Sequence, residues 1–138
     1  MKLPRVPAMT PKGRILLMDD EESILDVTKE VLMFLGYEIT FAREGGEAIR
    51  LYQEEMAAGR PFDIVILDLT IPAGMGGEEA VRKLKEIDPG VKAVVSSGYS
   101  MERSMTEYRA LGFSAVLAKP YKIKDLGDLL QGLMRQKS

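Results

Sequence analysis

Short apolar runs alternate with amphipathic stretches five times along this chain, and this alternation restricts the folds open to it more than any other feature. The apolar runs have the length of strands, and the amphipathic stretches have the length of helices. Strands that alternate with helices predict a parallel sheet covered by helices on both faces. The expected fold class is therefore α/β, with five strand–helix pairs in three layers.

Four of the expected strands are almost wholly apolar, which is typical of strands that are covered on both faces. They span residues 15–18, 64–67, 91–95 and 115–118. The remaining strand, 37–42, alternates more between polar and apolar residues and suits the edge of the sheet. Right-handed crossovers would wind the five units into a flavodoxin-like (βα)5 sandwich, a five-stranded parallel sheet with strand order 2-1-3-4-5.

The expected helices repeat apolar residues at helical spacing and end at glycine or proline signals. Gly36 and Gly112 follow the first and fourth stripes, 59–61 breaks the second, and 88–90 is a turn signal after the third. The five stripes comprise Ile24, Val27, Val31 and Leu35; Ala48, Ile49, Tyr52 and Met56; Ala80, Val81, Leu84 and Ile87; Met105, Tyr108 and Leu111; and Leu126, Leu129, Leu130 and Leu133.

The length of 138 residues predicts one domain. Residues 1–13 contain three prolines with basic residues between them and show no periodicity, so we expect an N-terminal tail or linker. The folded domain should span residues 14–136. The longest apolar runs are too short to cross a bilayer and no secretory signal is evident, so we expect a cytoplasmic chain without membrane contact.

Composition excludes several kinds of chemistry. The net charge of -2 provides no basic surface for direct nucleic-acid binding. The absence of cysteine rules out disulfides, a thiolate nucleophile and a cysteine zinc site. The absence of histidine removes the usual general base, a common metal ligand and any phosphohistidine on this chain. Carboxylates, hydroxyls and lysines must carry any reaction.

Polar residues follow four of the expected strands, and the carboxyl ends of parallel strands are where α/β sheets bind ligands. The first strand ends in the acidic run 19–22, the third in Asp68, the fourth in Ser96 and Ser97, and the fifth in Lys119. All four ends should converge on one edge of the sheet. The sequence therefore predicts a single polar site there.

Three acids at this edge, Asp19, Asp20 and Asp68, would repel one another unless a cation lay between them. Mg²⁺ prefers oxygen ligands and keeps several waters, so we assign Asp20 and Asp68 as direct ligands and Asp19 as a ligand through water. The backbone carbonyl of Thr70 would complete the protein's share, and Mn²⁺ is an alternative ion. The neighbouring Glu21 and Glu22 instead suit the start of a helix.

Each remaining candidate has a structural alternative. Asp68 could merely cap a turn, but Lys119, an ammonium at the end of an otherwise apolar strand, calls for a carboxylate partner and can bind phosphate. Lys119 could also be a surface lysine. The Ser97 hydroxyl could donate to a phosphoryl oxygen or to the backbone. Pro120 invites a cis peptide, with a trans proline as the alternative.

These strand ends resemble the receiver domain of bacterial two-component response regulators and hybrid histidine kinases over roughly residues 14–136. The matching segments are 15–21, 63–72, 95–99 and 118–121. The resemblance implies that Asp68 is the phosphoacceptor, that Asp19, Asp20 and the Thr70 carbonyl hold Mg²⁺, that Ser97 is the switch hydroxyl and that Lys119 contacts the phosphoryl group. An Asp68 oxygen would then attack phosphorus in line.

One position departs from the family pattern. Three residues before its lysine the family usually has an aromatic residue that rotates inward on phosphorylation, and this chain has Val116. We expect the output to run through the fourth helix and the loop before it, with Tyr99 and Tyr108 as candidates, or switching to be weak. Gly74, Gly76 and Gly77 lack the spacing of a phosphate-binding loop and predict a flexible loop.

The resemblance leaves the parent protein open. A stand-alone receiver, monomeric or weakly dimeric, and the receiver of a hybrid kinase both fit, and the 97–100 segment and proline-bearing N-terminus are similar to the hybrid kinases. The donor would be a phosphohistidine on a histidine kinase or phosphotransfer domain, bound through the first helix and the loop near Pro120. The receiver would catalyse only its own phosphorylation and dephosphorylation.

Two other classes are weaker. An aspartate-nucleophile phosphatase would also use an aspartate, a hydroxyl, a lysine and Mg²⁺, but such enzymes commonly carry a second aspartate where this chain has Thr70. An interaction module that has lost phosphotransfer would not be expected to keep Asp20, Asp68, Ser97 and Lys119 together. The sequence does not identify the kinase, the stimulus or the downstream target.

Overall fold

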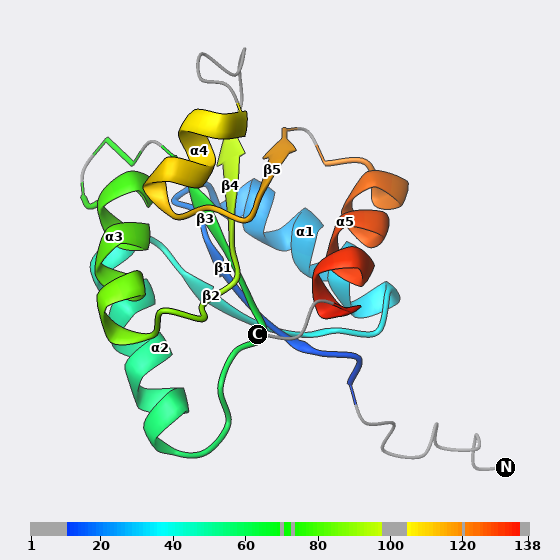
Figure 1. Cartoon of the computed structure of the whole chain (residues 1–138). Coiled ribbons are helices and arrows are strands. Elements are labelled where there is room, and N and C mark those ends of the chain that lie inside the picture. Colours follow the sequence, from blue (N-terminus) through cyan, green and yellow to red (C-terminus); the bar gives the residue numbers. More distant parts are fainter. Residues whose placement is uncertain (1–10, 70, 73, 98–104, 120, 136–138) are drawn as a thin grey trace, which may run out of the picture.

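The structure is a computed structural model, and it describes residues 11–69, 71–72, 74–97, 105–119 and 121–135. Strands and helices alternate along this part of the chain (Figure 1). The strands are β1 (Arg14–Met18), β2 (Glu38–Ala42), β3 (Ile64–Asp68), β4 (Ala93–Ser97) and β5 (Ala115–Ala118). The helices are α1 (Glu22–Phe34), α2 (Gly45–Ala57), α3 (Gly77–Ile87), α4 (Met105–Leu111) and α5 (Ile123–Arg135).

The five strands form one parallel sheet in the order β2-β1-β3-β4-β5, which confirms the predicted fold class and strand order. β1 pairs with β2 on one side and with β3 on the other, so the strand order reverses around β1 and β3. All strands end at the same edge, which we call the carboxyl edge; the opposite edge is the amino edge. Ligand sites in such sheets lie at the carboxyl edge, where the order reverses.

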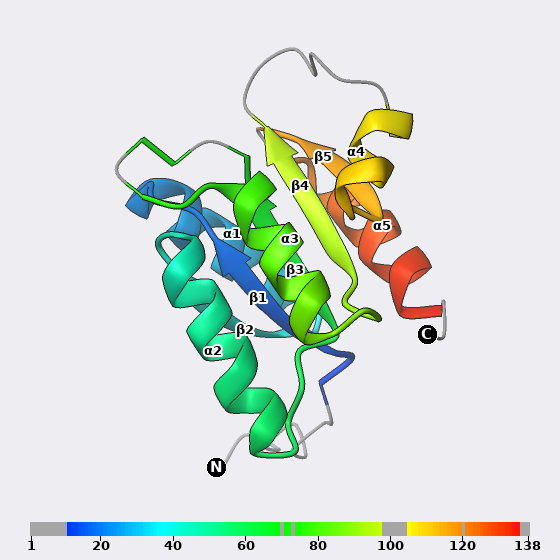
Figure 2. The same ribbon diagram turned by 60° about the vertical axis from the view of Figure 1, so that its left-hand side comes forward.

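Helices cover both faces of the sheet (Figure 2). Between the helices and the sheet lie two apolar clusters. One cluster lies under α2, α3 and α4 and includes Tyr52, Leu84 and Tyr108. The other lies under α1 and α5 and includes Leu32 and Leu126. Successive residues of a strand point to opposite faces, so β1, β3 and β4 contribute side chains to both clusters in turn. The strands are therefore rigid supports for whatever follows their last residues.

Helix α1 forms where it was predicted, and Val31 and Leu35 of the predicted stripe pack at the margin of the apolar cluster, but the centre of its buried face lies beside that stripe. The buried positions are Leu25, Thr28 and Leu32, whereas Val27 of the predicted stripe is 64% exposed. The sheet meets α1 one residue farther along each turn, since period alone does not fix which side of a broad apolar face packs inward. Helix α1 ends as expected: Gly36 has a φ of 96°, a left-handed conformation that favours glycine.

No helix in residues 11–135, apart from the undescribed positions within that range, is long and apolar enough to span a membrane. The predictions about Tyr99, Pro120 and the Thr70 carbonyl concern residues outside those that the structure describes. Ser97 ends β4, and its side chain likewise lies outside the description. The proposed division into residues 1–13 and 14–136 stays a prediction.

Candidate functional site at the carboxyl edge

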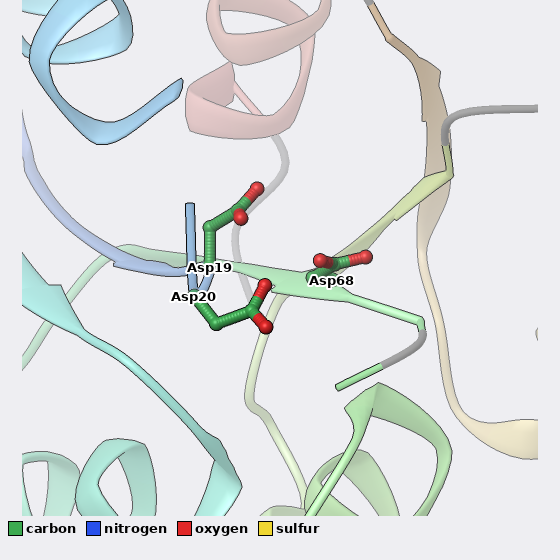
Figure 3. A group of neighbouring side chains, drawn as sticks. All are labelled: Asp19, Asp20 and Asp68. Atoms are coloured by element: carbon green, nitrogen blue, oxygen red, sulfur yellow. The ribbon is translucent and has the colours of Figure 1, made fainter. Parts of the chain in front are cut away.

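Three aspartates meet at the carboxyl edge. Asp19 and Asp20 follow β1, Asp68 ends β3, and one carboxylate oxygen of each lies within 4.8 Å of the others. Figure 3 shows the three side chains together beside the ends of the two strands. Asp19 is fully buried, Asp68 is 7% exposed and Asp20 is exposed. Packed carboxylates repel one another, so this arrangement favours a bound cation.

The alternation of strand residues explains how two of these acids come to share one face. Leu17 and Ile66 point into the cluster under α1 and α5. Asp19 and Asp68 stand two residues later on their strands and so leave the backbone on that same side. Asp20, one residue further, leaves on the other side, as Figure 3 shows. The site therefore combines carboxylates that leave the backbone on both sides of the sheet.

Lys119, just beyond β5, reaches into the aspartate cluster. Its ammonium lies 2.6 Å from Asp19 Oδ2 and 3.3 Å from Asp68 Oδ2, and its side chain is 11% exposed. Burial alone would lower the pKa of Lys119, but the hydrogen bond with Asp19 and the charges of Asp68 and Asp19 outweigh it, so the pKa is raised. The lysine is thus a fixed positive charge beside Asp68.

One oxygen of Asp19 organises the start of α1 and the other faces the site. The backbone N–H of Glu21 donates to Asp19 Oδ1 over 2.9 Å. Asp19 Oδ2 is buried beside Lys119 and has no other hydrogen-bond partner among the described residues. Glu22 lies in the first turn of α1 and pairs with Arg43, in agreement with a role at the helix start. A buried oxygen with spare acceptor capacity fits a second cation nearby.

The segment after Asp68 packs tightly, which corrects part of the prediction of a flexible loop. Gly77 is the first residue of α3, and a Cβ added there would lie 2.7 Å from the carbonyl oxygen of Asp68. At Gly76 a Cβ would lie 2.6 Å from the carbonyl oxygen of Leu69. The carbonyl of Met75 also accepts a hydrogen bond from the N–H of Gly45 in α2, over 2.8 Å. The glycines allow the backbone to approach closely.

A further pair of residues at this edge was not predicted from the sequence. The hydroxyl oxygens of Ser96 and Tyr121 lie 2.6 Å apart. The strand period places Ser96 on the face of Asp68, and a buried tyrosine hydroxyl generally needs a partner. That signal was available in the sequence, but the partner could not be named without the fold.

Comparison with known proteins identifies the chain. A family model of the response regulator receiver domain matches residues 15–131. The chain belongs to the response regulator receiver domain family. This receiver is 31% identical over 125 residues to sporulation initiation phosphotransferase F of Bacillus subtilis strain 168, which covers 91% of this chain and 96% of that protein. It is 33% identical over 116 residues to a response regulator receiver protein of Anaeromyxobacter sp. strain Fw109-5, which covers 84% of this chain and 46% of that protein.

Solved structures agree with this assignment. A response regulator receiver domain protein from Clostridium thermocellum superimposes with a TM-score of 0.79 and 26% identity, over 88% of this chain and 94% of that chain. The resemblance noted from the sequence is thereby confirmed, and nothing in the comparisons favours a phosphatase. The receiver spans about half the length of the Anaeromyxobacter protein, so the activity of any longer parent protein is a matter for proposal.

Membership of the family fixes the general function. The chain is a phosphoacceptor receiver domain of two-component signalling, a class that interacts with histidine kinases or phosphotransfer partners. Receivers generally bind Mg²⁺ at an acidic pocket, and the aspartate cluster at the carboxyl edge is such a pocket. Its carboxylate oxygens are the ligand type that Mg²⁺ prefers.

Proposed function

We propose that Asp68 accepts the phosphoryl group, and that Asp19, Asp20, Ser97 and Lys119 serve that transfer. The observation that carries the proposal is the position of the Lys119 ammonium, 3.3 Å from Asp68 Oδ2 and within a cluster of three carboxylates. A cation held beside a nucleophilic carboxylate can neutralise an incoming phosphoryl group. A phosphoryl group at this cluster would lie next to both the carboxylate of Asp68 and the ammonium of Lys119.

The proposed metal ligands are the carboxylates of Asp20 and Asp68 directly, Asp19 through water, and the carbonyl of Thr70, which lies outside the described residues. Clustered oxygens and the spare acceptor capacity of Asp19 Oδ2 fit a hard divalent ion such as Mg²⁺ or Mn²⁺. When bound, the ion would offset negative charge on the phosphoryl oxygens.

The proposed reaction is an in-line displacement at phosphorus. One oxygen of the Asp68 carboxylate forms the new bond while the bond from phosphorus to the donor's imidazole nitrogen breaks. Lys119 binds a phosphoryl oxygen, and the Ser97 hydroxyl donates to another. Catalysis in such transfers is mostly positioning and charge stabilisation, so the receiver promotes only its own phosphorylation and dephosphorylation.

We propose that the donor is a phosphohistidine on a histidine kinase or a phosphotransfer domain, since this chain contains no histidine. The donor would dock on α1 and the loop near Pro120. Exposed apolar side chains on α1 support this: Val27, Met33 and Phe34 are 64%, 56% and 80% exposed and are available for contact with a partner. A cytoplasmic location, a monomeric or weakly dimeric state and a hybrid-kinase parent stay predictions.

The output of the switch is proposed to run through α4. Val116 occupies the position where the family usually has an aromatic residue, and it packs against the cluster that contains Tyr108. Tyr108 is 1% exposed and lies edge-on to Phe113, with ring centroids 6.2 Å apart. Chemical shifts of residues 97–111 should move when Mg²⁺ and beryllofluoride, a phosphoryl mimic, are added. Unchanged shifts would rule out this route.

Mass spectrometry after incubation with acetyl phosphate and Mg²⁺ tests the phosphoacceptor directly. We expect wild-type receiver to gain the mass of one phosphoryl group and Asp68→Asn to gain none. Asp63→Asn is a matched control, because Asp63 lies at the amino edge and accepts a hydrogen bond from the N–H of Arg14. An adduct on Asp68→Asn, or none on wild type, would exclude Asp68 as the acceptor.

A further inference from the structure

A buried hydroxyl pair links β4 to the residues that follow β5. Ser96 is 1% exposed, Tyr121 is half-buried, and their hydroxyl oxygens lie 2.6 Å apart, a hydrogen bond in which either can donate. Buried hydroxyls are costly without a partner, so each residue satisfies the other. Phenylalanine in place of Tyr121 and alanine in place of Ser96 would fill nearly the same space and bring no hydroxyl that needs a partner. Packing alone therefore does not explain the two hydroxyls.

The pair lies beside the proposed phosphoacceptor. Ser96 is the register partner of Asp68 across β3 and β4, and of Leu117 across β4 and β5. The carbonyl of Ser96 accepts a hydrogen bond from the N–H of Leu69 over 3.0 Å. Tyr121 packs against the cluster under α1 and α5, the face on which Asp68 leaves its strand. The hydrogen bond therefore sits within one strand spacing of Asp68.

The charged groups that act on Tyr121 are those of the proposed site, Lys119, Asp19 and Asp68. Burial raises the pKa of Tyr121 to about 12; the hydrogen bond with Ser96 and the charge of Lys119 lower it, and the charges of Asp19 and Asp68 raise it. The phenol therefore stays protonated at neutral pH and acts as a neutral hydrogen-bonding group. It stands two residues after Lys119, so whatever holds the phenol restrains the lysine backbone as well.

We propose that Tyr121 is a positioning residue for phosphoryl transfer: bonded to the Ser96 hydroxyl, it fastens the segment that carries Lys119 to β4 and keeps the ammonium beside Asp68. The inference rests on the proposed roles of Asp68 and Lys119 and adds a residue that neither touches phosphorus nor binds the metal. Lys119 has four rotatable side-chain bonds, so a fixed backbone is needed to hold its charge within hydrogen-bonding reach.

The test compares Tyr121→Phe, Ser96→Ala and the double variant with wild type. Phosphorylation by acetyl phosphate with Mg²⁺ is followed by mass spectrometry at several donor concentrations, and rates are expressed per folded molecule. We expect each single variant to lose about threefold to tenfold in the rate constant at high donor concentration, the range of one neutral hydrogen bond. The double variant should lose no more than the larger single loss, because both changes break the same bond.

Tyr37→Phe is the matched control, since Tyr37 belongs to the same apolar cluster but precedes β2, far along the sheet from Lys119. It should phosphorylate at the wild-type rate. A wild-type rate for Tyr121→Phe, or a double variant whose loss is the product of the single losses, would overturn the inference while leaving Asp68 as acceptor. A change in urea midpoint with no change in rate per folded molecule would overturn it too. Failure of wild type to take up phosphate would instead defeat the proposed function.

Discussion

The guanidinium of Arg14 at the amino edge lies between two carboxylates, whereas at the carboxyl edge three carboxylates cluster and the ammonium of Lys119 pairs with two of them, Asp19 and Asp68. Arg14 Nε lies 2.7 Å from Glu38 Oε2, and a terminal nitrogen lies 2.7 Å from Glu55 Oε1. Its other terminal nitrogen donates to the carbonyl of Arg60, and its carbon Cζ lies 4.8 Å from the centre of the Phe62 ring. A second guanidinium, that of Arg60, lies 3.3 Å from Glu55, so this group joins β1, β2 and α2 with two cations for its two acids.

The comparison indicates that the charged group at the amino edge stabilises the fold, whereas the charged group at the carboxyl edge serves function. Burial alone would lower the pKa of Arg14, but hydrogen bonds with Glu38 and Glu55 raise it, so the matched cluster favours the charged state that it needs. The carboxyl edge instead retains negative charge that its own lysine does not balance. Such an excess is unfavourable in the isolated chain and favourable once a cation binds, which is typical of functional sites.

Replacement of Arg14 should break the amino edge with the largest effect. Arg14→Met keeps an apolar stem but removes the cation that Glu38 and Glu55 share and leaves Glu55 with Arg60 alone; the Arg14 and Glu55 side chains are both about a fifth exposed. We expect a loss of about 2 kcal/mol in the free energy of unfolding, between the values for exposed and buried pairs. Urea denaturation measures it.

Arg50→Met is the control for this prediction. Arg50 pairs with Glu54 one turn along α2, and its side chain is 57% exposed. The expected loss is about 0.3 kcal/mol. Equal losses for the two variants would show that the Arg14 cluster is no more than a set of surface pairs.

Removal of an acid from the carboxyl edge should have the opposite sign. Without metal, Asp20→Asn should gain about 0.5 kcal/mol in the free energy of unfolding, because one of three clustered charges is lost. Mg²⁺ at about ten times its dissociation constant should stabilise wild type by about 1.4 kcal/mol and the variant by much less. Urea denaturation with and without Mg²⁺ tests both statements.

Asp26→Asn serves as the comparison, since Asp26 is an exposed acid of α1 outside the cluster. It should respond to Mg²⁺ as wild type does. If Asp20→Asn lost stability in metal-free buffer, the acids of the carboxyl edge would have to be regarded as a balanced cluster like that of Arg14.

The carboxyl edge was the more predictable of the two from sequence. Strand-end position alone brought Asp19, Asp20, Asp68 and Lys119 together, because parallel strands end side by side. The amino edge was not foreseen, since Arg14 and Glu55 are far apart in the chain and neither follows an apolar run.

Two details of the fold also escaped the sequence for physical reasons. The buried face of α1, with Leu25 and Leu32, could not be chosen from a helix whose apolar residues cover more than half its circumference. The hydrogen bond between Ser96 and Tyr121 joins residues 25 positions apart in the chain, and hydrophobic periodicity does not reveal such a contact. In both cases tertiary contacts decided between local patterns that the sequence allowed equally.

The smallest predicted effect concerns Glu44, an acid of the carboxyl edge whose carboxylate already accepts hydrogen bonds from backbone N–H groups. Glu44 precedes α2 and accepts hydrogen bonds from the N–H groups of Gly46 and Glu47, both over 2.8 Å, and these bonds lower its pKa. A lowered pKa means that the charged group stabilises the fold above its ordinary value of 4.5, and that this contribution is lost as pH falls through the folded pKa.

Glu44→Gln should therefore be less stable than wild type at pH 6 and nearly equal to it at pH 3. The difference at pH 6 should be about 0.3 kcal/mol, because solvent screens this half-buried carboxylate at the surface. Glu44→Ser also puts a neutral acceptor near the same N–H groups, on a side chain that is common before a helix, and should show the same pH dependence as Glu44→Gln because both variants lose the charge. Urea midpoints that differ from wild type by a constant amount from pH 6 to pH 3 would contradict the prediction. Such a result would show that the charge of Glu44 adds nothing to the hydrogen bonds by which it caps α2.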